Sequence, residues 1–591
     1  MRRQGEEMRL RILILAVAAA LLVAAGGSHA AEADGDLIRL SVIFTNDIHG
    51  GIDPSGATFM NREFPPPLGG GASAATYIER VRDEAAESDN HYVLVMDQGD
   101  IFQGTPVGNY KDGETVVEFF NHVGVDLWTV GNHEFDEGAE NLWHLIEMSE
   151  MPVLSANLVW AESGEPVELV EPYLIKEFGG VKVGIIGLTT TDTPKMAFPK
   201  HVEPIEFLPE IETARKYVRE LREKGVDIVF VSGHMGLPYE REEAYWKMIE
   251  EEEEREAEEV REPLEESKWG PNVMKITHEV SGIDAFFGGH IHVGYDEPWI
   301  DPTNHTMCFQ TYGRGSGVGH IMLLIDPDTK SLAGYELPSY RGDLITLFED
   351  EWWPDPETAE MVNAMVDEAE AGMDRVIGQA ANDLTRGGEG ETRMGNLVCD
   401  AMREEMSADF AFTNLGGIRD QIPAGPITPR DVFKVLPFGN SIMVFEMDGR
   451  LLKEVIEYRV SADHHGVYMS GGEIVYNKTR PDYDRITQFT VGGEQWQPDK
   501  TYRVVTSDFL ASGNAGLYML PNVPEDKKMR SSTTMRDAVI HYIERHSPVK
   551  GVLDGRWVRD DTAEKSPELK EAMEGMEPLK PPGDESAGPY Q

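Results

Sequence analysis

The stretch Gly131-Asn132-His133-Glu134-Phe135-Asp136 decides how the rest of the chain is interpreted. It follows the apolar run 127–130, which predicts a buried strand, and its glycine permits a sharp exit from that strand. An amide oxygen of Asn132 and a ring nitrogen of His133 then lie at the strand's carboxyl end, where Asp136 is close enough to orient the histidine. Because Asn, Gly and Asp also form ordinary turns, the hexapeptide alone supports catalysis and a plain turn about equally.

Four other apolar runs, at 39–45, 92–96, 228–232 and 283–287, are also expected to be strands and are followed by Asp or His. The residues concerned are Asp47, His49, Asp100, His234, His290 and His292. In a layered α/β fold the carboxyl ends of strands line one crevice, so these side chains and Asn132 are predicted to form a metal site. A single histidine is more often a structural hydrogen-bonding residue; the shared position of the whole set favours a metal.

The spacing also predicts the backbone at these residues. Asp47 and His49 are two residues apart, as are His290 and His292, and on an extended chain such pairs point to one side. A glycine precedes Asp100 and lets its carboxylate turn back toward the strand end, where two oxygens can bridge two ions. We therefore expect extended backbone at both pairs and a turn at Asp100.

The composition limits the classes of protein to which the chain can belong. The 591 residues suffice for two or three domains, and an apolar fraction of 40% is ample for folded cores. The formal net charge of −52 opposes binding to a nucleic acid polymer or an anionic membrane. Cys308 and Cys399 are the only cysteines, and we expect both to be buried free thiols.

Residues 1–30 have the pattern of a secretory signal peptide: basic residues, then an apolar stretch short for a membrane span, then small residues. No other stretch approaches the length of a membrane helix. The mature protein is therefore expected to be periplasmic or secreted, as a monomer or a loose dimer.

The rest of the chain divides into two predicted domains, 37–350 and 378–560. Between them, an Asp-Pro-Glu start at 355–357 and apolar residues at helical spacing predict a linker helix within 351–377. The charged, proline-containing segment 561–591 is expected to be a disordered tail. The glutamate-rich run 250–266 is interpreted as a solvated helix or an insertion rather than a metal buffer.

Two features of the second domain are candidates for contacts with a substrate. Glycines at 416 and 417 precede Arg419, so backbone can approach an anion while the guanidinium forks onto it. Phe438 lies in a loop beside a glycine, where it is either a stacking surface or, as the residue alone favours, a core aromatic.

Taken together, Asp47-x-His49, Gly99-Asp100, the hexapeptide at 131–136, Gly233-His234 and Gly289-His290-x-His292 resemble the signature of the calcineurin-like metallophosphoesterases. With the second domain included, roughly residues 38–560 resemble the secreted 5′-nucleotidase and UDP-sugar hydrolase family. The resemblance implies an α/β fold: a four-layer metallophosphoesterase β-sandwich flanked by helices, then a smaller α/β (α+β) substrate-binding domain. It also implies a rotation of one domain against the other.

The resemblance assigns roles to particular residues. It implies two divalent ions of zinc, manganese or iron, one held by Asp47, His49 and His292, the other by Asn132, His234 and His290, with Asp100 bridging. His133, oriented by Asp136, would be catalytic. The substrate contacts it implies are Asn414, Gly417, Arg419, a clamp of Phe438 and Phe509, and a further arginine, either Arg386 or Arg393. One departure concerns Ala515, which stands where the family has a ribose-binding aspartate.

The predicted function is release of phosphate from nucleoside 5′-monophosphates, with UDP-sugars and cyclic nucleotides as further candidate substrates. Three alternatives stay open: a related exported hydrolase of another ester, including a sulfur ester; a non-catalytic nucleotide-binding surface protein; and a metal-sequestering protein that uses the glutamate run. The complete ligand set together with His133 and Asp136 argues against a binding protein, which needs no such set.

Overall fold

The computed structural model describes residues 37–574, except 62–63, 198, 239, 259–271, 340, 388–389 and 462–465. The predicted signal peptide, residues 575–591 and part of the glutamate run therefore lie outside the described residues. One prediction is wrong where the predicted tail begins. Within 561–574 the helix α17 (Pro567–Ala572) is capped by the side chain of Ser566, and Leu569 is fully buried in the second domain. Ala572 and Met573 pack on the same cluster, and the backbone N–H of Ser566 donates to Thr487 O at 2.9 Å, so several contacts hold this segment to the domain.

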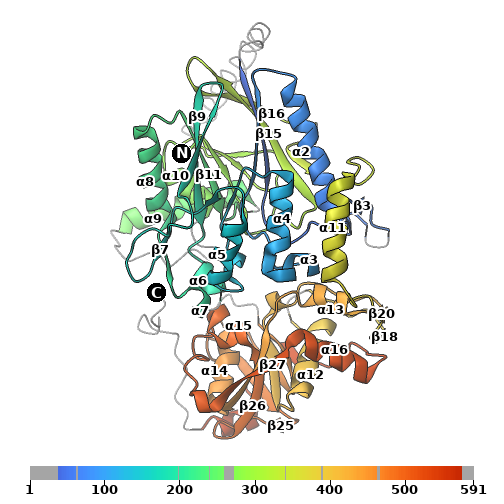
Figure 1. Cartoon of the computed structure of the whole chain (residues 1–591). Coiled ribbons are helices and arrows are strands. Elements are labelled where there is room, and N and C mark those ends of the chain that lie inside the picture. Colours follow the sequence, from blue (N-terminus) through green and yellow to red (C-terminus); the bar gives the residue numbers. More distant parts are fainter. Residues whose placement is uncertain are drawn as a thin grey trace, which may run out of the picture.

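The first domain (blue to yellow in Figure 1) is built on two large sheets. One has the strand order β16-β15-β1-β4-β5-β6, with β17 paired to β15. Its strands are β1 (Ile38–Thr45), β4 (His91–Asp97), β5 (Leu127–Thr129), β6 (Val153–Leu154), β15 (Gly317–Asp326), β16 (Ser331–Glu336) and β17 (Leu344–Thr346). The other has the order β13-β14-β12-β11-β9-β8. Its strands are β8 (Tyr173–Phe178), β9 (Val181–Thr189), β11 (Ile228–His234), β12 (Ala285–Phe287), β13 (Trp299–Ile300) and β14 (Met307–Phe309).

Helices cover the outer faces of both sheets, which gives the four layers expected. Side chains of both sheets, Phe44 and Phe287 among them, share one buried cluster between the sheets. A second cluster joins the first sheet to α2 (Gly70–Ala86), α4 (Glu114–Val123) and α5 (Ala139–Met148). A third joins the other sheet to α8 (Glu210–Glu223) and α10 (Val273–Glu279). In the parallel pairs β1–β4, β4–β5 and β9–β11 all carboxyl ends point to one edge, where the ligand loops begin.

The second domain (orange to red in Figure 1) is built on a sheet of order β22-β19-β26-β21-β27. Its strands are β19 (Phe410–Thr413), β21 (Ser441–Asp448), β22 (Tyr468–Ser470), β26 (Thr501–Ser507) and β27 (Lys528–Thr534). The helices α12 (Arg393–Glu405), α13 (Pro429–Val435) and α16 (Met535–His546) contribute to one buried cluster, and α14 (Gly449–Val460) to another. The second cluster also includes a sheet of β23 (Gly472–Tyr476), β24 (Ile486–Val491), β25 (Glu494–Gln495) and β28 (Trp557–Arg559).

A helix connects the domains as the sequence predicts. It is α11 (Pro356–Ala369), and the Asp355 side chain caps it by accepting from the backbone N–H of Thr358 at 2.8 Å. Its apolar side packs on the cluster of the first domain that contains α2. The exact domain boundaries stay predictions.

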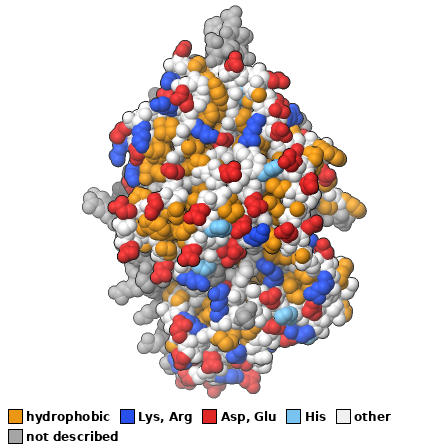
Figure 2. Space-filling model, in the orientation of Figure 1, with side chains coloured by type: hydrophobic (Ala, Val, Ile, Leu, Met, Phe, Trp, Pro, Cys, Tyr) orange, Lys and Arg blue, Asp and Glu red, His pale blue; other side chains and the backbone are white. Residues whose placement is uncertain are grey.

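Two expectations from composition are met. Cys308 and Cys399 are free and buried, as predicted. Figure 2 shows Asp and Glu side chains scattered over the visible face of both domains, in keeping with the net charge. Among the described helices, none combines the length and the apolar character needed to cross a membrane.

Candidate active site

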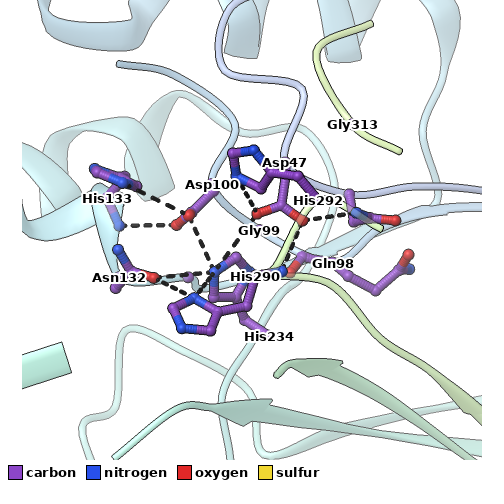
Figure 3. A network of polar contacts seen from close by, with 12 residues as sticks. Asp47, Gln98, Gly99, Asp100, Asn132, His133, His234, His290, His292 and Gly313 are labelled. Carbon is purple, nitrogen blue, oxygen red and sulfur yellow. Dashed lines mark hydrogen bonds and ion pairs between the residues drawn. The ribbon is translucent and has the colours of Figure 1, made fainter. Parts of the chain in front are cut away.

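The predicted ligands converge where the strands of both sheets end, as Figure 3 shows, but their backbone is not the predicted one. Asp47, His49, Asp100, His290 and His292 all have positive φ, between 47° and 76°. The expectation of extended backbone at the two pairs is therefore wrong. Left-handed backbone at Asp and His is sterically unfavourable and is kept where the surrounding structure imposes it, commonly at functional sites.

One group of ligands lies around Asp47. The Nε2 atoms of His49 and His292 are 2.9 Å apart, and Nε2 of His292 is 3.4 Å from Oδ1 of Asp47. Asp47 Oδ2 accepts hydrogen bonds from the Asn46 amide at 2.6 Å and from the backbone N–H of His290 at 2.7 Å. These bonds fix the carboxylate so that Oδ1 faces the two imidazoles.

A second group lies around Asn132. Its Oδ1 is 3.1 Å from Nε2 of His234 and 2.9 Å from Nδ1 of His290, and those two nitrogens are 3.3 Å apart. Asp100 joins this group, because its Oδ2 is 3.0 Å from Nε2 of His234. Asp100 also belongs to a cluster with His49 and His133, which places its carboxylate between the two groups.

The donor set fits divalent metal ions. Oδ1 of Asp47 is buried and has no hydrogen-bond partner, a costly state for a carboxylate oxygen that a cation would relieve. Burial, with the nearby charges of His292 and His133, lowers the pKa of His49 to about 3, and burial with His234 lowers that of His290 to about 4. Both rings are therefore neutral at neutral pH, the form that ligates a metal. At His234 burial opposes a charge, but the carboxylates of Asp100 and Asp47 raise its pKa to about 10, so this ring would release a proton on binding a metal. Imidazole and carboxylate donors suit zinc, manganese or iron.

His133 and Asp136 form the expected pair. Nδ1 of His133 is 2.6 Å from Oδ2 of Asp136, and its backbone N–H donates to Oδ1 of Asp100 at 2.8 Å. Burial opposes a charge on His133, yet the carboxylates of Asp136 and Asp100 raise its pKa to about 9. Since Nδ1 is engaged, Nε2 is the atom free to hold a proton toward a substrate; it lies 4.0 Å from Oδ2 of Asp100.

Glu134 has a role that the sequence did not reveal. It is fully buried, and its carboxylate accepts from the backbone N–H groups of Gly131 at 2.5 Å, Asp100 at 3.0 Å and Ile101 at 2.8 Å. It thereby ties the loop that carries Asn132 to the loop that carries Asp100. Its place inside the quoted hexapeptide was visible in the sequence, but its partners in the other loop were not.

The second domain brings two predicted substrate contacts to this site. The ring of Phe438 is stacked on that of His133, with centroids 5.8 Å apart, and the guanidinium of Arg419 lies 5.5 Å from the centre of the Phe438 ring. Arg386 lies beside Arg419, whose carbonyl accepts from its Nη1 at 2.9 Å. Arg393 instead begins α12, where its side chain lies beside Gly551.

The remaining predicted contacts follow β19 and β26, which pair in parallel, so these residues begin at one edge of the sheet of the second domain. Asn414 lies just before the 3₁₀ turn Leu415–Gly417, and Phe509 is half-buried in α15 (Asp508–Ala511). Ala515 has a φ of 54° in the next turn. The neighbouring Asn514 is buried, and its amide donates to Phe509 O at 3.1 Å and to Ala197 O of the first domain at 3.5 Å.

Two family models match the chain. The model for calcineurin-like phosphoesterases matches residues 40–294, which contain the whole metal-ligand set and the His133–Asp136 pair. The model for the 5′-nucleotidase C-terminal domain matches residues 376–522, which contain Arg419 and Phe438.

Known proteins resemble the chain over most of its length. A 5′-nucleotidase of Vibrio parahaemolyticus is 27% identical over 92% of this chain and 96% of its own. Endonuclease YhcR of Bacillus subtilis is 27% identical over 81% of this chain, which spans only 38% of that longer protein. The solved structure of a 5′-nucleotidase precursor from Thermus thermophilus superposes with a TM-score of 0.71 and 26% identity, covering 90% of this chain and 100% of that one.

The fold, the donor set and both family models define a two-domain metallophosphoesterase, a hydrolase of phosphoric esters. Within that class, the chain is of the 5′-nucleotidase type: it matches the models of both domains and resembles proteins of that name over most of its length.

Proposed function

We propose that this protein is a two-metal phosphohydrolase that releases phosphate from nucleoside 5′-monophosphates. The main support for this proposal is that both domains contribute residues to one site. The ligand clusters and His133 come from the first domain, and Phe438 and Arg419 reach the same point from the second. A phosphate at the metals and a base in the second domain would be parts of one bound molecule.

Asp47, His49 and His292 would hold one ion, Asn132, His234 and His290 the other, and Asp100 would bridge them. Two such ions supply activation of a water nucleophile and neutralise charge on the phosphoryl oxygens. Side chains of the protein supply the proton and a positive charge for the phosphoryl group. His133 holds a proton at Nε2 for the departing oxygen, because Asp136 fixes the ring through Nδ1. Arg419 offers a guanidinium to the phosphoryl group.

The test is hydrolysis of AMP, UMP, UDP-glucose and 2′,3′-cyclic AMP by the metal-loaded protein, followed by chromatography of the products, because the first cleavage of the last two releases no inorganic phosphate. The proposal expects the highest kcat/KM on the 5′-monophosphates. Higher efficiency on either of the other esters would replace the proposed substrate, and no hydrolysis with two metals bound would favour a binding protein. We also propose export, on the strength of the signal-peptide pattern, so the substrate would be met outside the cytoplasm.

A further inference from the structure

Gln103 lies in the loop between the proposed metal ligand Asp100 and the short helix α3 (Pro106–Asn109). Its side chain is buried, and its φ is 66°, in the left-handed region. Its backbone carbonyl accepts a hydrogen bond from Nδ1 of the proposed ligand His49 at 3.1 Å. Left-handed backbone is unfavourable for a residue with a side chain, so the contacts of Gln103 must hold it there.

This carbonyl fixes how His49 faces the metal centre. Because Nδ1 donates to Gln103 O, and to Phe102 O at 3.3 Å, it carries the proton of the neutral ring. Nε2 is left with its lone pair, and it lies 2.9 Å from Nε2 of His292 in the centre. A hydrogen bond at the other nitrogen of a metal-binding histidine sets both the tautomer and the direction of the ring.

The side chain of Gln103 is held at both ends of its amide. Nε2 donates to Oε1 of Glu137 at 3.1 Å, and Oε1 accepts from Nδ2 of Asn109 at 2.8 Å. The neighbours determine the orientation of both amides. Since the backbone N–H of Gly104 donates to Oδ1 of Asn109 at 2.9 Å, the nitrogen of Asn109 faces Gln103, and the oxygen of Gln103 must receive it.

Asn109 also reaches the second domain. Its Nδ2 donates to the carbonyl of Pro437 at 3.3 Å. Within the second domain the same carbonyl accepts from Nη2 of Arg536 at 2.8 Å, so its position is fixed from that side as well. One chain of hydrogen bonds thus runs from the second domain through Asn109 and Gln103 to His49.

Tying loops together does not by itself require this geometry. Gln310 of the same domain is also buried and bonded at both ends of its amide, from Leu237 N–H at 2.9 Å and to Val293 O at 2.6 Å. The φ of Gln310 is not positive. A buried glutamine can therefore join two loops with ordinary backbone, whereas the left-handed backbone of Gln103 accompanies a carbonyl turned toward His49.

We propose that Gln103 is a positioning residue that transmits the contact between the two domains to the metal ligand His49. When the second domain docks, Pro437 O receives Asn109, and Asn109 holds the amide of Gln103, whose carbonyl aims the ring. Docking of the second domain and metal binding then strengthen each other, because coupling between two sites is reciprocal. The inference rests on the proposed function for the metal ions alone and needs no particular substrate.

The test is calorimetric titration of manganese into the metal-free full-length protein. Gln103→Leu keeps the approximate size of the side chain and removes both of its hydrogen bonds. It should weaken binding of the ion held by His49 about 10- to 100-fold, the usual effect of losing a bond behind a ligand. Asn109→Asp keeps the bond from Gly104 N–H and loses both donated bonds, so the affinity should fall here too. Its added negative charge would by itself favour a cation, so charge cannot explain a loss.

Asn121→Leu is the matched control. The Asn121 amide also makes two hydrogen bonds within the first domain, to Met148 O and from Glu150 N–H, both at 2.9 Å. It lies at the end of α4 that leads into β5, opposite the edge where the ligands lie. This variant should keep the parent affinity for manganese, even where it lowers the unfolding temperature as much as Gln103→Leu does. An equal loss of affinity in the control, or binding by Gln103→Leu at the parent affinity, would overturn the proposal.

The double variant Gln103→Leu/Asn109→Asp tests the chain of hydrogen bonds itself. If both residues act through one carbonyl, it should lose no more affinity than Gln103→Leu alone; losses that add would show two independent effects and contradict the proposal. The titrations use no substrate. The predicted losses of manganese affinity in a protein that does not hydrolyse AMP would uphold this inference and refute the proposed function, whereas AMP hydrolysis with unchanged affinities would uphold the proposed function alone.

Discussion

The ring of Phe438, from the second domain, lies flat on the ring of His133, from the first, with centroids 5.8 Å apart and an interplanar angle of 9°. An interdomain hydrogen bond of 3.3 Å, from the Asn109 amide to Pro437 O, holds the same loop. Because His133 covers one face of the ring, Phe438 cannot present that face to a base in this arrangement. Stacking of a nucleobase on that face therefore requires the ring or the domain to move.

The stacking surface can be tested with Phe438→Leu. If the base takes the place of His133 on this ring, its loss should raise KM for AMP by roughly 2- to 10-fold, since an aromatic pair contributes ~0.5–1.5 kcal/mol beyond area burial. Ribose 5-phosphate, which has no base, is the control substrate, and its KM should not change. An equal rise in KM for both substrates would show that Phe438 acts on the phosphate end of the site.

Glu134 should matter for metal affinity rather than for chemistry. Glu134→Gln leaves one oxygen to accept from the three N–H groups now bound, and an unsatisfied buried donor costs ~1–3 kcal/mol. We expect the rate at limiting metal to fall and to recover at saturating metal. Activity is to be measured against metal concentration. A titration curve that coincides with the parent's would mean that the two loops hold their ligands without Glu134.

Replacing His133 should lower the rate of hydrolysis without lowering the metal content. His133→Ala is expected to keep both ions and slow the chemical step by about 100- to 10,000-fold, the usual scale for a lost proton donor. His144→Ala is the control, because His144 is half-exposed and pairs with Glu114 on the surface of the same domain. Loss of metal together with rate would make His133 a ligand instead.

We expect the enzyme to discriminate only weakly between ribose and deoxyribose in the substrate. Ala515 has no group to bind a diol, and the amide of Asn514 is already engaged by Phe509 O and Ala197 O. We predict that kcat/KM for AMP exceeds that for dAMP by less than about a hundredfold, the upper end of ~1–3 kcal/mol for one lost hydrogen bond. A larger preference would reveal another ribose-binding residue.

Much of the fold follows from apolar runs that end in polar residues. The runs at 39–45, 92–96 and 228–232 became β1, β4 and β11 within one or two residues. Long apolar strands are fixed by burial on both faces, which the sequence displays directly.

The backbone at the ligands could not be predicted in this way. Positive φ at Asp47 accompanies contacts with a distant loop, for example the bond from Arg314 N–H to its carbonyl. The hydrogen bonds of Glu134 and the stacking of Phe438 on His133 likewise join segments far apart in the chain. A single sequence does not show which loops come into contact.

The central claim, that two metal ions at the converging ligands hydrolyse nucleoside 5′-monophosphates, is tested most directly by measuring metal content and AMP hydrolysis on the same samples. We predict about two ions per chain, loss of activity on chelation and recovery on adding zinc or manganese. His290→Ala and Asp100→Asn should lower metal content and rate together, because each removes or weakens a ligand. Hydrolysis of AMP at the parent rate by the metal-free protein, or by either variant with both ions in place, would contradict the account.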